Sequence, residues 1–189
     1  MSGAFLALMF SVGALAIGAG LVMFRQSGWP AADLSGEAPV TASFRTLEKE
    51  ARESVIRDAV VLATELSRVD DFIAPTEVNS IRDFILAHVA ENQVADITGA
   101  MRAGMKQPAS SAVVQQICER IRGDYALGHR ELVAHFLVHV AHADGLLCPE
   151  EKAFLERVVP EIGVAPGALS NMISAYDEWA RAQLNAAAG

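Results

Sequence analysis

ADGLLCPEE, residues 143–151, repeats a pattern that the chain already uses 74 residues earlier as VDDFIAPTE, residues 69–77. The aspartate, the proline and the last glutamate coincide in the two copies. Each copy follows a long apolar segment and precedes an amphipathic one, and proline is well tolerated at the first position of a helix. The sequence therefore predicts two related helical hairpins, each with a helix, an aspartate turn and a proline-started helix, packed against each other through their apolar faces.

The remainder of the chain also favours helices. Apolar residues recur at spacings of three and four, and no segment alternates in the manner of a β-strand. We therefore predict an all-α fold whose main domain is a bundle of about seven helices. The expected helices are residues 43–69, 75–89, 94–105, 108–121 and 130–143, a sixth that begins at Pro149, and a seventh that follows Pro166 and ends near Leu184, before a fraying alanine-rich tail.

The N-terminal segment is a second informative feature. From Ala4 to Phe24 the sequence has 21 consecutive residues without a charge, and a helix of that length matches the roughly 30 Å hydrocarbon core of a bilayer. A cleaved signal peptide is the alternative, although the segment has no basic n-region and no clear cleavage site. We predict a transmembrane anchor at residues 1–25, a linker at residues 26–40 and a helical domain at residues 41–189.

This predicted anchor leads to two further expectations. Basic residues follow the span and none precedes it, so the positive-inside rule places the helical domain in the cytoplasm, with a single pass through the bacterial inner membrane. Small residues four apart within the span would let a second copy approach closely and form a homodimer. These residues are Ala14, Ala16, Gly18 and Gly20. The alternative is that small residues are simply common in transmembrane helices.

Composition and cysteine spacing exclude several classes of function. The chain has 15 basic and 23 acidic side chains and a formal net charge of −8, so a phosphate backbone would be repelled and we expect no nucleic-acid partner. Cys118 and Cys148 lack the spacing of a disulfide framework or of a zinc site. Cys148 is the better candidate for a reactive thiol, because a helix N-terminus can lower the pKa of a thiol.

The second copy of the repeat also resembles a known family. Residues 141–151, AHADGLLCPEE, resemble the Ala-Asp-Gly signature of TerB-like tellurite-resistance domains, in which a hydrophobic residue and a glutamate follow. A single span followed by such a domain is similar to the N-terminal part of the membrane-anchored DjlA-like co-chaperones. The resemblance implies a non-enzymatic module that binds a partner protein in chaperone-related work or in an envelope or metalloid stress response. The sequence has no His-Pro-Asp tripeptide, so direct activation of Hsp70 is not implied.

The repeated acidic residues are the candidate metal ligands. Packing of the two hairpins would bring together the carboxylates of Asp70, Glu77, Asp144 and Glu151, and oxygen-rich clusters suit Ca²⁺ or another divalent cation such as Mg²⁺. The resemblance to TerB-like domains also implies an acidic surface and metal binding. The alternative is structural, because aspartate forms turns and acidic residues in the first turn of a helix interact favourably with the helix macrodipole.

Other candidate sites are weaker. His135, His139 and His142 are spaced by four and three residues and share one stripe of a helix, which suggests zinc binding, pH sensing or packing beside the core. The glutamate of the HExxH motif is missing, and no nucleophile elbow, P-loop or dinucleotide-binding glycine motif occurs. We therefore expect no enzymatic activity. Two functions stay open, a protein-interaction module and a divalent metal-ion-binding stress protein that uses the repeated acidic residues.

Overall fold

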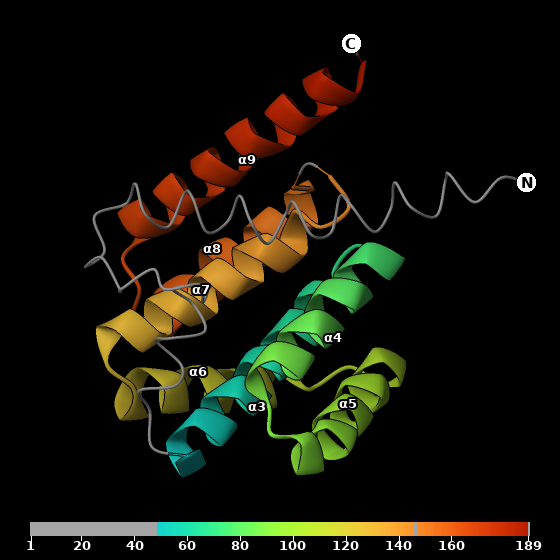
Figure 1. Ribbon diagram of the computed structural model, residues 1–189. Coiled ribbons are helices and arrows are strands. Elements are labelled where there is room, and N and C mark those ends of the chain that lie inside the picture. Colours follow the sequence, from blue (N-terminus) through green and yellow to red (C-terminus); the bar gives the residue numbers. More distant parts are fainter. Residues whose placement is uncertain (1–48, 146, 189) are drawn as a thin grey trace, which may run out of the picture. The chain divides into compact units, whose positions relative to one another are not determined.

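The computed structural model describes residues 49–145 and 147–188 (Figure 1). Within these residues the chain forms seven helices and no strand, which confirms the all-α class that the spacing of apolar residues predicts. The described helices all belong to one compact unit. They are α3 (Lys49–Leu66), α4 (Pro75–His88), α5 (Glu91–Lys106), α6 (Ser111–Asp124), α7 (Leu127–Ala141), α8 (Pro149–Glu161) and α9 (Pro166–Ala188).

Helix starts follow local signals in the sequence. Pro75 and Pro149 occupy the first position of α4 and α8, as predicted, because a proline there removes no helical hydrogen bond. Pro108 does not begin a helix, and this prediction is wrong. The N-cap of α6 is Ser110, whose Oγ accepts a hydrogen bond from the backbone N–H of Val113 at 3.3 Å. A serine cap satisfies a backbone donor that an uncapped start would leave without a partner.

Other boundaries differ from the prediction by a few residues. α3 ends at Leu66 because the chain turns over the next four residues. α5 begins at Glu91 and α7 at Leu127, each three residues before its predicted start. α9 continues to Ala188, beyond the predicted end at Leu184, since alanine has the highest helix propensity of all residues.

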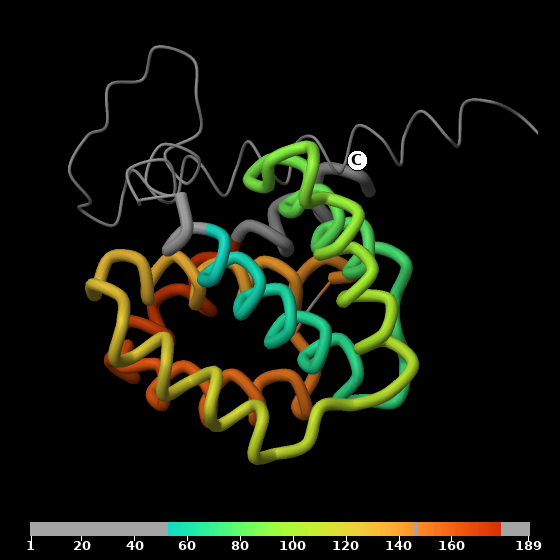
Figure 2. The backbone as a smooth tube through the Cα atoms, turned by 90° about the horizontal axis from the view of Figure 1, so that it is seen from below, coloured from blue at the N-terminus to red at the C-terminus, as the bar shows by residue number. Residues whose placement is uncertain are grey.

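The two helices that precede the aspartate turns, α3 and α7, contribute more buried apolar residues to the core than any other described helix. α7 is apolar around most of its circumference, and eight of its fifteen residues are buried, as expected for a helix surrounded by others. It packs against α3, α4, α8 and α9, and Phe136 stacks on Phe84 of α4 with 3.8 Å between ring centroids. Figure 2 shows α3 between the α4–α5 pair, in green, and the helices of the C-terminal half.

The transmembrane helix in the predicted fold class needs correction. No helix within the described ranges is long and apolar enough to cross a membrane. Even α9, the longest, contains three charged residues in 23, namely Asp177, Glu178 and Arg181. The predicted span with its small residues Ala14, Ala16, Gly18 and Gly20, and the predicted linker, lie outside the described residues. What the structure supports is the helical bundle.

Candidate functional site: the paired acidic turns

The first copy of the repeat forms the turn between α3 and α4. Asp70 Oδ1 accepts a hydrogen bond from the backbone N–H of Phe72 at 3.0 Å, and Asp71 adopts a left-handed backbone conformation with a φ of 62°. As α4 begins, Glu77 folds back and its Oε2 accepts a hydrogen bond from the N–H of Ala74 at 3.0 Å. The turn therefore exposes two aspartates and Phe72, which is 63% exposed, and buries Glu77.

The second copy forms the turn between α7 and α8. Asp144 is exposed, and Gly145 has a φ of 145°. Glu151 Oε2 accepts a hydrogen bond from the N–H of Cys148 at 2.9 Å, and Cys148 Sγ accepts one from the N–H of Glu151 at 3.4 Å. This arrangement is a capping box in which cysteine replaces the usual serine or threonine. Both copies thus share a glutamate at the third helical position that binds back to the N-cap.

Glu77 lies within electrostatic reach of the other three acidic residues of the repeat. Glu77 is 3% exposed and Glu151 is 6% exposed. Burial raises the pKa of Glu77 to about 7, and the carboxylates of Glu151, Asp144 and Asp70 add to the rise while the N-cap hydrogen bond opposes it. Burial also raises the pKa of Glu151, with a further contribution from Asp144, whereas its hydrogen bonds to the α8 N-cap and to Glu77 act in the opposite direction.

These carboxylates are of two kinds. Glu77 and Glu151 are buried and each binds the N-cap of its own helix, whereas Asp70 and Asp144 are exposed. Within residues 49–145 and 147–188 no group of three or more His, Cys, Asp or Glu side chains is arranged to hold a metal ion. Capping of α4 and α8 is the role that the hydrogen bonds of the two glutamates show.

Of the three histidines in the stripe, His135 and His139 of α7 are half-buried and His142, the C-cap of α7, is buried. His142 Nδ1 is 2.8 Å from a backbone carbonyl oxygen of its own helix, its Nε2 is 3.1 Å from Asp177 Oδ1 of α9, and its ring stacks on Tyr176. Burial lowers the pKa of His135 to about 4 and also lowers the pKa of His139, where His142 contributes. The lowered pKa values favour the neutral imidazole at both positions, which argues against the pH-sensing hypothesis for His135 and His139.

Neither cysteine is an activated nucleophile. Both are free thiols. Burial raises the pKa of Cys118 to about 12, with Glu161 adding to the rise. Cys148 is the N-cap of α8, yet burial raises its pKa to about 11, and the Glu151 carboxylate adds to the rise while the N–H of Glu151 opposes it. The expectation that the helix N-terminus lowers the pKa of Cys148 is wrong, because loss of solvent outweighs the donated hydrogen bond.

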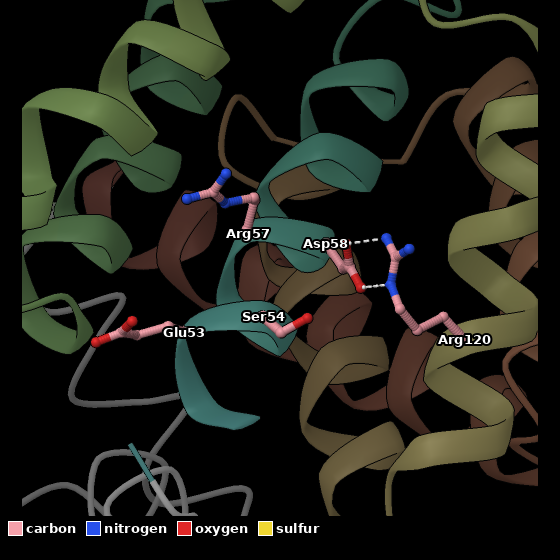
Figure 3. Close-up of a pocket in the computed structure, with 5 residues that line it drawn as sticks. All are labelled: Glu53, Ser54, Arg57, Asp58 and Arg120. Atoms are coloured by element: carbon pink, nitrogen blue, oxygen red, sulfur yellow. Dashed lines mark hydrogen bonds and ion pairs between the residues drawn. The ribbon is translucent and has the colours of Figure 1, made fainter. Parts of the chain in front are cut away.

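A surface pocket of about 410 Å³ lies beside the start of α3 (Figure 3). Its main feature is the ion pair between Asp58, whose side chain is 4% exposed, and Arg120 of α6. Arg120 donates from Nε and Nη2 to the two carboxylate oxygens of Asp58 at 2.8 and 2.6 Å. Figure 3 shows Glu53 and Arg57 directed away from this pair. The charged groups of the pocket do not converge, so the paired turns are the better candidate site.

Comparison with known proteins identifies the family of this chain. Comparisons with curated proteins and with solved structures found no match. The resemblance to DjlA-like co-chaperones stays a prediction. Residues 57–173, a range that contains both acidic turns and most of the seven helices, match the family model described as "Tellurite resistance protein TerB". Because the match covers more than half of the sequence, the chain belongs to the TerB family.

Proposed function

We propose that this TerB-family domain is a non-enzymatic protein-interaction module in a tellurite-resistance-related stress response, and that the paired turns are its contact surface. The observation that carries the proposal is the exposure of Phe72 next to Asp70 and Asp71. Asp144 of the second turn is close to this surface, because Asp144 and Asp70 both act on the buried Glu77. A large aromatic side chain held in the solvent on a turn is available for burial by another protein.

The chemistry of this surface indicates the kind of partner. An aromatic group among carboxylates fits a partner with an apolar pocket and a basic rim, because opposite potentials steer association and disfavour other partners. The net charge of −8 acts in the same direction over the whole chain. The resemblance to DjlA-like proteins suggests a chaperone-related protein as one partner of this kind, and the acidic surface argues against nucleic acid.

A photo-crosslinking experiment tests the contact surface. A photoreactive phenylalanine analogue is placed at Phe72 in the full chain, and at Leu86 as a matched control, since Leu86 is 58% exposed near the other end of α4. We expect a discrete crosslinked protein from position 72 that position 86 does not give, and its loss in Asp70→Asn/Asp144→Asn. Equal products from both positions, or none from position 72, would contradict the proposed surface.

The biological context needs a separate test. Cells that lack the gene are expected to grow poorly on tellurite, to recover with the unaltered chain, and to recover less with Phe72→Ser. Leu86→Ser is the control, because it also removes an exposed apolar side chain but lies outside the turns. Equal rescue by the two variants would separate the tellurite phenotype from the paired turns.

Divalent cation binding is a second candidate function, which the electrostatic effect of Asp70, Asp144 and Glu151 on Glu77 favours, although the side chains would have to rearrange to coordinate an ion. Asp144 acts on both buried glutamates, and Asp70 acts on Glu77. A cation among like charges would replace their repulsion with attraction, and carboxylate oxygens are the ligands that Ca²⁺ and Mg²⁺ prefer. Binding would require the glutamates to leave their N-caps or to share their second oxygens with the ion.

Titration calorimetry of the full chain with Ca²⁺, Mg²⁺ and Zn²⁺ tests this second candidate. The informative variant is Asp70→Asn/Asp144→Asn, because asparagine keeps an oxygen that can accept the hydrogen bond from Phe72. The matched control is Asp83→Asn/Asp96→Asn, which removes two charges from exposed positions of α4 and α5. Saturable heat that only the first variant loses would support a site in the turns. No heat at millimolar cation would exclude it.

A further inference from the structure

α5 is attached to the bundle by few buried side chains. Ile97 and Met101 are the two buried residues among its sixteen, whereas α7 buries eight of fifteen. α5 lies at the edge of the bundle, where it packs against α3 and α4 (Figure 1). Segments with few buried apolar contacts open at a lower free energy than the rest of a domain.

The sequence of α5 also disfavours the helix itself. Gly99 and Gly104 lie within it, and each glycine lowers the local helical equilibrium about fivefold relative to alanine. Its N-cap, Ala90, makes no side-chain hydrogen bond to the first turn. Gly104 lies close to α3, where an added Cβ would be 3.0 Å from Thr64 Cγ2, tighter than an ordinary contact, whereas a Cβ at Gly99 would meet no atom within 4 Å.

The C-terminal end of α5 is held by polar contacts from the last turn of α3 and from the turn that follows it. Arg68 Nη1 donates to the carbonyl oxygen of Gly104 at 3.0 Å and also to that of Met105. Glu65 Oε1 accepts a hydrogen bond from the N–H of Ala109 in the following loop at 2.9 Å. These contacts are only partly buried, so water can replace them when the helix moves away.

We propose that α5 is a lid that opens from α3 and α4 as one unit, with Arg68 as its latch, while the other helices stay folded. The proposal goes beyond the interaction surface described above, because the side chains that hold α5 in place, Arg68 and Glu65, are not among the acidic and aromatic side chains of the paired turns. Opening uncovers the face of α3 around Thr64, a side chain that is 1% exposed in the closed bundle. The lid is thus a built-in conformational step whose equilibrium a second molecule could shift.

Hydrogen exchange on the full chain tests the lid directly. Amides of residues 95–106 are expected to exchange at least tenfold faster than those of α7, under conditions where exchange reports the opening equilibrium. The first four amides of α5 are left out, because a helix does not protect them. If residues 95–106 and α7 exchange at the same rate, only global unfolding exposes α5 and the proposal is wrong.

Two pairs of variants sharpen the test. Gly99→Ala is expected to slow exchange in α5 about fivefold, while the control Gly123→Ala in α6, where an added Cβ also meets nothing, leaves α5 unchanged.

Arg68→Ala is expected to speed exchange in α5 about tenfold, while Arg82→Ala, which removes an arginine whose side chain is 53% exposed, has no effect there. Should Arg68→Ala unfold the chain, the glycine pair still decides. Equal α5 exchange in Gly99→Ala and Gly123→Ala would overturn the proposal.

Discussion

The two turns of the repeat have a glutamate at the equivalent position, Glu77 in the first and Glu151 in the second, but differ in the residues around it. In the first turn a left-handed backbone position is occupied by Asp71, and the N-cap, Ala74, makes no side-chain cap hydrogen bond. In the second turn the positive φ belongs to Gly145, and Cys148 completes a capping box. The first turn therefore carries backbone strain and lacks a cap acceptor, whereas the second has neither weakness. What both turns need is the glutamate that binds back to the helix N-terminus.

The electrostatic environment of the two glutamates also differs. Glu77 is the more buried of the two and is acted on by the carboxylates of Glu151, Asp144 and Asp70. Asp144 is the carboxylate that opposes ionisation of Glu151. The first turn is thus the one in which charge works against folding. This difference shows that two copies of a motif can form the same hydrogen bonds while repulsion between carboxylates is larger in one copy than in the other.

The largest effect is expected from neutralising Glu77. Its pKa is raised from 4.5 to about 7 in the folded chain, so its stabilising contribution is present below pH 4.5 and is lost as the pH rises through 7. Glu77→Gln keeps an acceptor for the N–H of Ala74 and removes this loss. Between pH 5 and pH 8 the free energy of unfolding of the unaltered chain should fall relative to the variant by up to about 3 kcal/mol, as measured by urea titration.

The control for this pH dependence is Glu156→Gln. Glu156 is an exposed acidic residue of α8, with 60% of its side chain accessible, and its replacement should leave the pH profile of stability unchanged. If the free energy of unfolding falls equally with pH in the unaltered chain and in Glu77→Gln, ionisation of the buried Glu77 does not destabilise the first turn.

A smaller effect is expected from exchanging the left-handed residues. Gly145→Asp, which copies the first turn into the second, should lower the free energy of unfolding by about 2 kcal/mol, because non-glycine residues rarely adopt this backbone conformation. An added Cβ at this position meets no atom within 4 Å, so the loss would come from the backbone conformation and from the charge added beside Asp144, and not from steric overlap. Asp71→Gly, the reverse exchange, should be neutral or stabilise by less than about 1 kcal/mol. Thermal and urea unfolding of both variants check this asymmetry, and equal losses would refute it.

The smallest effect is expected at the N-caps. Cys148→Ala removes the sulfur that accepts the hydrogen bond from Glu151 and makes the second turn like the first. Because sulfur is a weak acceptor, the loss should be about 0.5 kcal/mol. Cys148→Ser supplies the usual cap acceptor and should keep or slightly raise stability. A larger loss for serine than for alanine in urea titrations would mean that packing of the sulfur, rather than capping, stabilises α8.

Local signals in the sequence predict much of this fold. The starts of α4 and α8 are correct because proline at the first helical position acts through its own ring and missing N–H. The same rule fails at Pro108, where the serine two residues later is the stronger signal. Apolar spacing identifies α7 as a core helix. Its boundaries differ from the prediction because helix ends fray, and apolar spacing does not specify the terminal residues.

The candidate site is less accessible to such reasoning. The repeat directs attention to Glu77 and Glu151, yet their burial and mutual contact depend on how two distant hairpins pack. Other polar pairs, such as Asp58 with Arg120 and His142 with Asp177, join positions far apart in the chain. One signal was available for Asp58, a carboxylate on the apolar side of its helix, since a buried charge requires a partner.

The raised pKa values of the buried Cys118 and the half-buried Cys148 have a consequence for how the domain reacts with oxidants. Oxidation of cysteine proceeds through the thiolate, and with pKa values of about 12 and about 11 almost no thiolate exists on Cys118 or Cys148 at neutral pH. An oxidising oxyanion such as tellurite that consumes reactive sulfur elsewhere would therefore find little to attack in this bundle.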